Sequence, residues 1–264
     1  MEKTILKKII EQKKIEISEQ KKINSEQKIR ESAEKSSDKK RSFYNALKKT
    51  ADSGISIIAE IKRASPSKGA IKINLNAANL AKAYQQGGAA AISVLTDSHF
   101  FKGSFDDFKT VKKNCLLPML RKDFIISSYQ IFQSAALLKA DAILLIVQIL
   151  SKEQLKDYIS LARQLGMSAL VEIHSEKDIN SAHLANAEII GINNRDLKTF
   201  KTNMKNAIRL VSMIDKKIIS VAASGIKNKQ DIKESKKAGL YNFLIGESLV
   251  KADDTISFLK NLLM

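Results

Sequence analysis

The feature that most constrains the fold of this chain is a repeating pattern from residue 55 onward. In it, short apolar runs alternate with longer stretches of helical periodicity. The runs are rich in Ile, Leu, Val and Ala and show no clear alternation of polar and apolar residues. That pattern is typical of parallel strands buried on both faces. Parallel neighbours need a crossover connection, and the helical stretches supply it.

Eight strands are predicted, at 55–62, 89–95, 117–124, 142–147, 168–173, 189–193, 217–222 and 242–245. Each is followed by a predicted helix, at 76–86, 104–114, 128–139, 152–166, 175–186, 204–214, 229–238 and 255–262. Eight consecutive units with short connections predict an α/β fold, a closed (β/α)8 TIM barrel rather than an open doubly wound sheet.

A charged segment precedes the barrel. It is rich in Lys, Glu, Gln and Ser, with apolar residues such as Ile5 and Ile9 at helical spacing. We expect one or two amphipathic helices there and a short one over 42–49. Acidic residues interrupt the basic ones, which favours a solvated helical face over a membrane-binding one. The predicted organisation is a helical extension packed on the barrel, 1–50, and a single catalytic barrel domain, 51–264.

Composition narrows the classes of partner. The formal charge is +17, but the basic residues are spread along the chain, and aromatic residues are 6% with no Trp, so nucleic-acid binding is not expected. The longest apolar run, 142–150, is too short to span a bilayer, and residues 1–4 lead into no signal-like apolar segment. The sole cysteine, Cys115, excludes an intrachain disulfide, so we predict a cytoplasmic protein without a membrane partner.

Two charges stand at the end of the first predicted strand. Glu60 and Lys62 lie two residues apart, hence on one face, just before a turn-forming Ser-Pro-Ser-Lys-Gly segment at 65–69. Unpaired charges near a core are costly. We therefore expect these two side chains to pair with each other or to meet a polar ligand.

Other polar residues end other strands and would face the same mouth of the barrel. Glu172 is a lone carboxylate among aliphatic residues, so its ionised form requires a facing cation such as a nearby lysine. Lys122 ends an otherwise apolar strand and is a functional candidate. Arg121, Asp123 and Asp196 are expected to point outward or to form structural ion pairs.

Glycine-containing pairs follow the last two strands. Ser224-Gly225 and Gly246-Glu247 stand where such barrels commonly hold a phosphate with backbone N–H groups. We therefore expect a phosphorylated small-molecule substrate. The histidines show no metal-ligand spacing, and no Gly-x-Ser-x-Gly elbow occurs, so neither a metal site nor a serine nucleophile is predicted.

Six segments in chain order resemble the indole-3-glycerol phosphate synthase family of tryptophan biosynthesis. They are Ala59-Glu60-Ile61-Lys62 with Ser65-Pro66-Ser67, Leu120-Arg121-Lys122-Asp123-Phe124, Leu170-Val171-Glu172, Ile192-Asn193-Asn194-Arg195-Asp196-Leu197, Ala223-Ser224-Gly225-Ile226 and Leu244-Ile245-Gly246-Glu247-Ser248-Leu249. The resemblance implies a carboxy-lyase that converts 1-(2-carboxyphenylamino)-1-deoxyribulose 5-phosphate to indole-3-glycerol phosphate. Carbon dioxide and water are lost, and no metal or organic cofactor is needed.

The resemblance also implies roles for the site residues. Lys122 and Lys62 would act on the carbonyl oxygen and the carboxylate of the substrate, one of them as general acid; which one stays open. Glu172 would be the acid or base of the later dehydration, with Glu60 and Asn193 holding these groups. The implied substrate-binding residues are Ser65, Arg195, Ser224, Gly225, Gly246 and Glu247. Lysines close to each other and to a desolvated ligand are expected to have lowered pKa values.

One position departs from the family. Ala223 stands where the family usually has a glutamate that helps orient a lysine, so we expect an active enzyme with lowered turnover. Two alternatives are a degenerate phosphate-binding barrel kept as a binding or scaffold partner, and a sister barrel such as phosphoribosylanthranilate isomerase. The isomerase typically relies on a Cys and an Asp, and Cys115 lies away from the opening strand. We expect a monomer, with contacts to other enzymes of its pathway as a further hypothesis.

Overall fold

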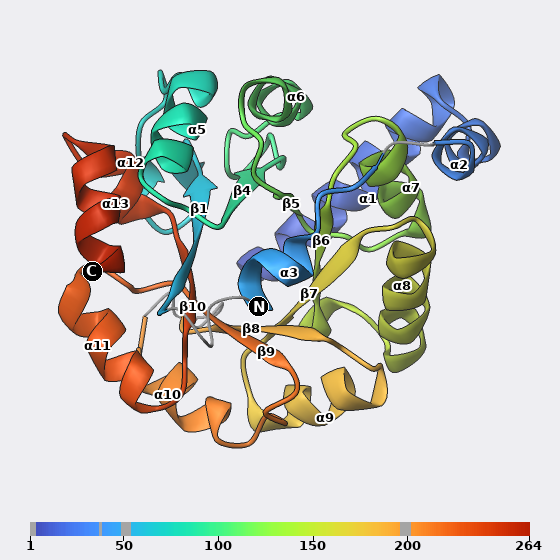
Figure 1. Ribbon diagram of the computed structural model, residues 1–264. Helices are drawn as coiled ribbons and strands as arrows, with labels where there is room; N and C mark the ends of the chain where they lie inside the picture. Colours follow the sequence, from blue (N-terminus) through green and yellow to red (C-terminus); the bar gives the residue numbers. More distant parts are fainter. Residues whose placement is uncertain (1–3, 37–38, 49–53, 196–201) are drawn as a thin grey trace.

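The computed structural model describes residues 4–36, 39–48, 54–195 and 202–264. Eight parallel strands close a barrel in the order β1-β10-β9-β8-β7-β6-β5-β4, with helices around it (Figure 1). Neighbours in the barrel are thus neighbours in the chain, except that β10 closes the ring on β1. The predicted (β/α)8 TIM barrel is confirmed.

The barrel strands agree with the predicted runs to within a few residues. They are β1 Ser56–Ile61, β4 Ala91–Leu95, β5 Met119–Lys122, β6 Ala142–Ile146, β7 Ser168–Ile173, β8 Ile189–Asn193, β9 Ile219–Ala223 and β10 Asn242–Ile245. The prediction for the third strand was too long, because the chain leaves the sheet after Lys122. A short hairpin at the predicted turn, β2 Ala64–Ser65 with β3 Gly69–Ala70, was not foreseen as strands.

The surrounding helices begin and end close to their predicted limits. They are α5 Ala77–Gln86, α6 Phe105–Asn114, α7 Ser128–Ala136, α8 Lys152–Gln164, α9 Glu176–Leu184, α10 Lys205–Val211, α11 Lys229–Lys237 and α13 Thr255–Leu263, with a 3-10 turn η1 at Val147–Ile149. Their starts have local causes, since the side chains of Asn76 and Ser104 each accept a backbone N–H of the first helical turn. One short helix, α12 Glu247–Lys251, was not predicted.

Among the described residues, three helices precede the barrel: α1 Ile5–Ile23, α2 Glu26–Glu34 and α3 Phe43–Lys48. In Figure 1, α1 runs from the middle of the ring outward to the side where α2 lies beside α7. Tyr129 of α7 donates its hydroxyl to the carbonyl of Asn24 at 2.9 Å and so ties this helical segment to the barrel. The proposed boundary between residues 50 and 51 lies outside the described residues.

Two apolar layers fill the molecule. The larger lies between strands and helices, and the second fills the barrel interior with residues such as Ile58, Leu120 and Leu170. Phe43 and Leu47 of α3 belong to the inner cluster. Helix α3 therefore closes the barrel at the end opposite the carboxyl ends of the strands. Side chains alternate along a strand, so the residues two positions further along also face inward. These residues are Glu60, Lys122 and Glu172.

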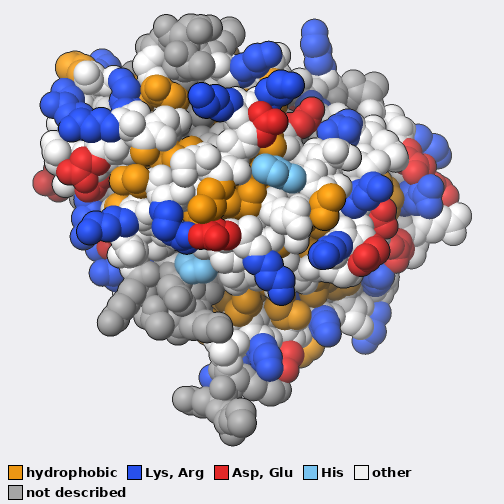
Figure 2. Space-filling view, turned by 90° about the horizontal axis from the view of Figure 1, so that it is seen from below, with side chains coloured by type: hydrophobic (Ala, Val, Ile, Leu, Met, Phe, Trp, Pro, Cys, Tyr) orange, Lys and Arg blue, Asp and Glu red, His pale blue; other side chains and the backbone are white. Residues whose placement is uncertain are grey.

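Lys and Arg side chains are scattered over the face shown in Figure 2, with Asp and Glu between them. This scatter matches the even spread of basic residues along the chain. In the described part of the chain, none of the helices has the length and apolar character needed to cross a membrane.

Candidate active site

A cavity of about 670 Å³ opens at the carboxyl ends of the barrel strands. Every site residue predicted from the sequence lines it: Glu60, Lys62, Ser65, Lys122, Glu172, Asn193, Arg195, Ser224, Gly225, Gly246 and Glu247. Cys115, by contrast, follows α6 and is not among the lining residues. Its place offers no support for the isomerase alternative, which would need a cysteine at the mouth.

Glu60 and Lys62 form the ion pair expected at the end of β1. The Lys62 Nζ donates to Glu60 Oε1 at 2.8 Å, and Glu60 is only 4% exposed. Burial raises the pKa of the Glu60 carboxyl, but the ammonium groups of Lys62 and Lys122 outweigh this and leave it below its ordinary value. Glu60 therefore supplies a fixed negative charge beside both lysines.

Lys122 and Glu172 form a second pair across the barrel mouth. The Lys122 Nζ lies 3.3 Å from Glu172 Oε2, which provides the cation expected opposite this carboxylate. Burial lowers the pKa of Lys122, but Glu172 and Glu60 more than offset that effect and raise it above its ordinary value. The expectation of a lowered lysine pKa is thus wrong for Lys122 in the free protein, because two carboxylates face it.

Asn193 links this pair to the neighbouring loop. Its Nδ2 donates to Glu172 Oε1 at 3.1 Å, and its Oδ1 accepts the backbone N–H of Arg195 at 3.0 Å. The Arg195 guanidinium in turn donates to Ser67 Oγ at 3.0 Å. The loops after β1 and β8 are therefore joined over the cavity, and Glu172 is held from two sides.

The turns after β9 and β10 bring backbone close to the cavity. Ser224 and Gly225 have φ of +68° and +87°, and a Cβ at Gly225 would meet Thr202 Cγ2 at 2.4 Å. A Cβ at Gly246 would lie 2.7 Å from Glu60 Oε1. Glycine at these two positions lets the backbone approach both the cavity and the Glu60 carboxylate.

Glu247 follows Gly246 at the start of α12. Its carboxylate accepts a hydrogen bond from Lys251 at 2.8 Å, which is the main reason that its pKa lies below its ordinary value. The acidic side chain is thus already paired with a cation on its own helix. The backbone of this turn remains the group suited to an anionic ligand.

An apolar wall completes the cavity, and the sequence analysis did not foresee it. Phe101 and Phe124 have ring centroids 6.0 Å apart, and both line the cavity. Ile5, Leu6 and Ile9 of α1 line it as well. The helical spacing of these three residues was visible in the sequence, but only the fold shows that they cover the mouth.

Arg121 and Asp123 flank Lys122 and point away from the barrel interior. They pair with each other, Nη2 to Oδ2, at 3.0 Å, as expected for structural residues. Both are buried rather than on the surface, since α1 lies over them and places Lys13 against Asp123. The sequence analysis missed Lys13, and Asp196 lies outside the described residues.

Ala223 ends β9 on the inner face. It pairs in register with Asn193 on one side and Leu244 on the other, and it lines the cavity. No carboxylate enters the site from this position. Ala223, the departure noted in the sequence, therefore lies among the residues that line the cavity.

The closed barrel and the charged cluster at its strand ends define the class: a (β/α)8-barrel enzyme whose site lies at the carboxyl ends of the strands. Solved structures agree on the fold. N-acetylmannosamine-6-phosphate 2-epimerase from Clostridium perfringens has a TM-score of 0.57 at 14% identity, covering 81% of this chain and 93% of that one. Thiamine phosphate pyrophosphorylase from Pyrococcus furiosus has a TM-score of 0.58 at 16% identity, covering 83% and 95%.

Sequence comparison is more specific than the fold. The sequence model described as indole-3-glycerol phosphate synthase matches residues 6–262. Proteins of that name from Desulfosudis oleivorans and Lachnoclostridium phytofermentans are 58% and 47% identical to this chain over 200 and 199 residues. These matches cover 76% of both chains in the first case, and 75% of this chain and 73% of the relative in the second. The chain belongs to the indole-3-glycerol phosphate synthase family.

Proposed function

We propose that this protein is a carboxy-lyase of tryptophan biosynthesis that converts 1-(2-carboxyphenylamino)-1-deoxyribulose 5-phosphate to indole-3-glycerol phosphate. Family membership supports this reaction over the isomerase and the degenerate barrel. The observation that carries the assignment of roles is the placement of Lys62, Lys122, Glu60 and Glu172 within one cavity.

Ring closure is the first step. The ring carbon that bears the carboxylate attacks the ketone carbon, and the ketone oxygen gains negative charge as the new bond forms. Lys122 donates a proton to that oxygen, since its raised pKa keeps it protonated at neutral pH. Lys62 binds the substrate carboxylate, and Glu60 orients its ammonium group through their 2.8 Å contact.

Decarboxylation and dehydration follow. Carbon dioxide leaves from the ring carbon that attacked the ketone, and the electron pair of the broken bond restores the aromatic ring. The new hydroxyl then leaves as water while the carbon next to the nitrogen loses a proton. Glu172 serves as the acid–base group of this step, and Asn193 holds its carboxyl group in position.

The phosphate occupies the opposite side of the cavity. Backbone N–H groups of the turns at Ser224-Gly225 and Gly246-Glu247 bind it, where glycine permits a close approach. Ser65 and Arg195 contact other polar parts of the substrate from the loops after β1 and β8. This arrangement stretches the substrate across the mouth, with its aromatic ring on the side of Phe101.

The test is a fluorescence assay for indole-3-glycerol phosphate formation in metal-chelated buffer. We expect turnover by the parent protein, its loss in Lys122→Met, and its retention in Lys156→Met, a matched change at an exposed lysine on α8. Absence of turnover in the parent, with inorganic phosphate still bound, would instead favour a binding barrel.

Lowered turnover is part of the proposal. Ala223 leaves the site without the carboxylate that the resemblance implies at the end of β9, while the four charged catalytic candidates remain in the cavity. We also propose a monomer with contacts to other enzymes of its pathway. Light scattering at several protein concentrations tests the oligomeric state.

A further inference from the structure

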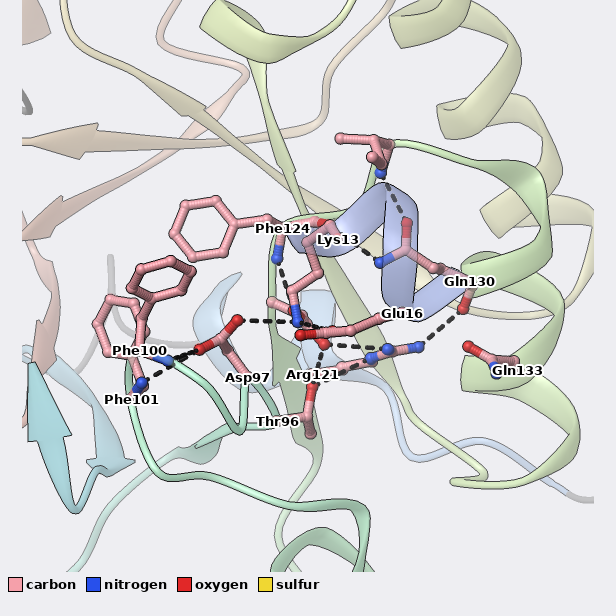
Figure 3. A network of polar contacts seen from close by, with 12 residues as sticks. Lys13, Glu16, Thr96, Asp97, Phe100, Phe101, Arg121, Phe124, Gln130 and Gln133 are labelled. Carbon is pink, nitrogen blue, oxygen red and sulfur yellow. Dashed lines mark hydrogen bonds and ion pairs between the residues drawn. The ribbon is translucent and has the colours of Figure 1, made fainter. Parts of the chain in front are cut away.

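The Lys13 ammonium is buried between α1 and the ends of β4 and β5 (Figure 3). Its Nζ lies 2.7 Å from Glu16 Oε2, 2.8 Å from Asp97 Oδ2 and 3.1 Å from Asp123 Oδ1, and its side chain is only 4% exposed. Three carboxylates therefore surround the ammonium group, Glu16 through a hydrogen bond and Asp97 and Asp123 through ion pairs. Two of these carboxylates belong to the barrel and one to α1 itself.

The two barrel carboxylates also hold the aromatic wall of the cavity. Asp97 Oδ1 accepts the backbone N–H of Phe101 at 3.1 Å, and Asp123 Oδ1 accepts that of Phe124 at 2.8 Å. Lys13 therefore binds both groups that fix the backbone under the two rings. Figure 3 shows the side chains of Phe101 and Phe124 on the same side of this cluster, to the left of the Lys13 ammonium.

The cluster also borders the end of β5, the strand that carries Lys122. Asp123 directly follows Lys122, and the alternation of side chains sends one into the cluster and the other into the cavity. Asp123 is further bound by Thr96 Oγ1 at 2.6 Å and by Arg121 at 3.0 Å. The end of β5 is thus fixed from the outer side of the barrel.

An anchor that served stability alone would not need these charges. Replacing a buried ion pair by well-packed apolar groups is often neutral or stabilising, whereas charges that must face one another restrict how two elements can pack. Here the bonded cation sits one and two helical turns beyond Ile9 and Ile5, which line the cavity. The cation therefore sets where this part of α1 lies over the mouth.

We propose that Lys13 is a positioning residue that holds α1, Phe101 and Phe124 together as one wall, against which the aromatic ring of the substrate packs. The inference rests on the proposed function for the nature of that ring. Loss of the cation would let the two phenylalanine loops and α1 move independently. The ring would then spend less time in the attacking geometry, while the phosphate site on the far side of the cavity would stay intact.

The experiment compares Lys13→Met with Lys14→Met, a matched change at the adjacent exposed lysine of α1. Backbone hydrogen exchange is measured at a temperature where both variants are folded. We expect faster exchange at the amides of Phe101 and Phe124, together with those of α1, in Lys13→Met alone. Faster exchange confined to α1 would overturn the proposal, because the wall would not depend on Lys13.

Kinetics supply the second measurement. We expect kcat of Lys13→Met to fall by about 10- to 100-fold, the scale of a misplaced reacting group. The concentration of inorganic phosphate that inhibits turnover by competing with the substrate should stay unchanged. A kcat within about twofold of the Lys14→Met value would refute the inference. If the parent protein shows no turnover, only the proposed function is refuted. The hydrogen-exchange measurement still decides the role of Lys13.

A second variant covers the case in which Lys13→Met does not fold. Lys13→Met combined with Asp97→Asn removes one cation and one anion together, and the new side-chain amide would keep an oxygen for the Phe101 N–H. Asp123 retains Arg121 as its partner. The same exchange and kinetic results are expected, and a double variant that matches Lys14→Met in both would refute the proposal.

Discussion

Replacing Glu172 by Gln tests the electrostatic account of the site most directly. The Lys122 Nζ lies 3.3 Å from the Glu172 carboxylate, and the Lys122 side chain is 18% exposed. At this distance a unit charge pair is worth about 5 kcal/mol at an effective dielectric of 20 and about 1.3 kcal/mol in water. Since about 1.4 kcal/mol corresponds to one pKa unit, Glu172→Gln should lower the pKa of Lys122 by about one to four units.

The sign follows from the two opposing effects on Lys122. Burial favours the neutral amine, and the facing carboxylates favour the ammonium, so removing one carboxylate shifts the balance toward the neutral form. Glu60 remains in the variant, and its carboxylate still raises the pKa of Lys122 in part.

The assay is an NMR titration of protein labelled with ¹⁵N-lysine, in which Lys122→Met identifies the signal. The parent signal should stay protonated beyond the ordinary lysine range, and the Glu172→Gln signal should titrate at lower pH. Glu176→Gln, at an exposed glutamate on α9, is the control. A difference of less than about half a unit between Glu172→Gln and the parent would refute the account.

Four further predictions concern the site and the fold. Ala223→Glu should raise kcat in the indole-3-glycerol phosphate assay, and an unchanged rate would remove the hypothesis that this position limits turnover. Gly246→Ala should lower kcat/KM by about tenfold or more, because the new Cβ displaces the Glu60 carboxylate 2.7 Å away; activity equal to the parent would contradict this. Glu60 and Asp123 have pKa values below their ordinary 4.5 and 3.8, so their stabilisation is present above those values and is lost as pH falls below them. Thermal unfolding between pH 7 and 3 measures this loss, and a flat profile would contradict it. Phe43→Ala should cost about 3–5 kcal/mol in urea unfolding, because the ring is fully buried in the barrel interior, yet leave kcat unchanged below the melting range.

The fold could be predicted because its main signal is local. A strand buried on both faces needs a continuous apolar run, so β6 and β7 stand out in the sequence. Alternation of side chains along the strands is enough to place Glu60, Lys122 and Glu172 at the mouth of the barrel. The short helix α12 escaped prediction because five residues are too few to establish a helical period.

The role of α1 could not be predicted for a different reason. Lys13 and Lys14 are identical neighbours in the sequence, and only the packing of α1 on the barrel buries one and exposes the other. The direction of the pKa shift of Lys122 likewise depends on distances across the barrel. Such distances join residues far apart in the chain, and no local pattern encodes them.

The pairing of β1 with β10 has a consequence for biosynthesis. Ile58 lies in register with Leu244, and Glu60 lies against Gly246, so one wall of the site joins segments separated by most of the chain. Synthesis proceeds from the amino terminus, and β1 emerges from the ribosome long before β10. During that interval the nascent chain holds β1 with an unpaired edge, and it gains a complete active site only when β10 arrives and closes the ring.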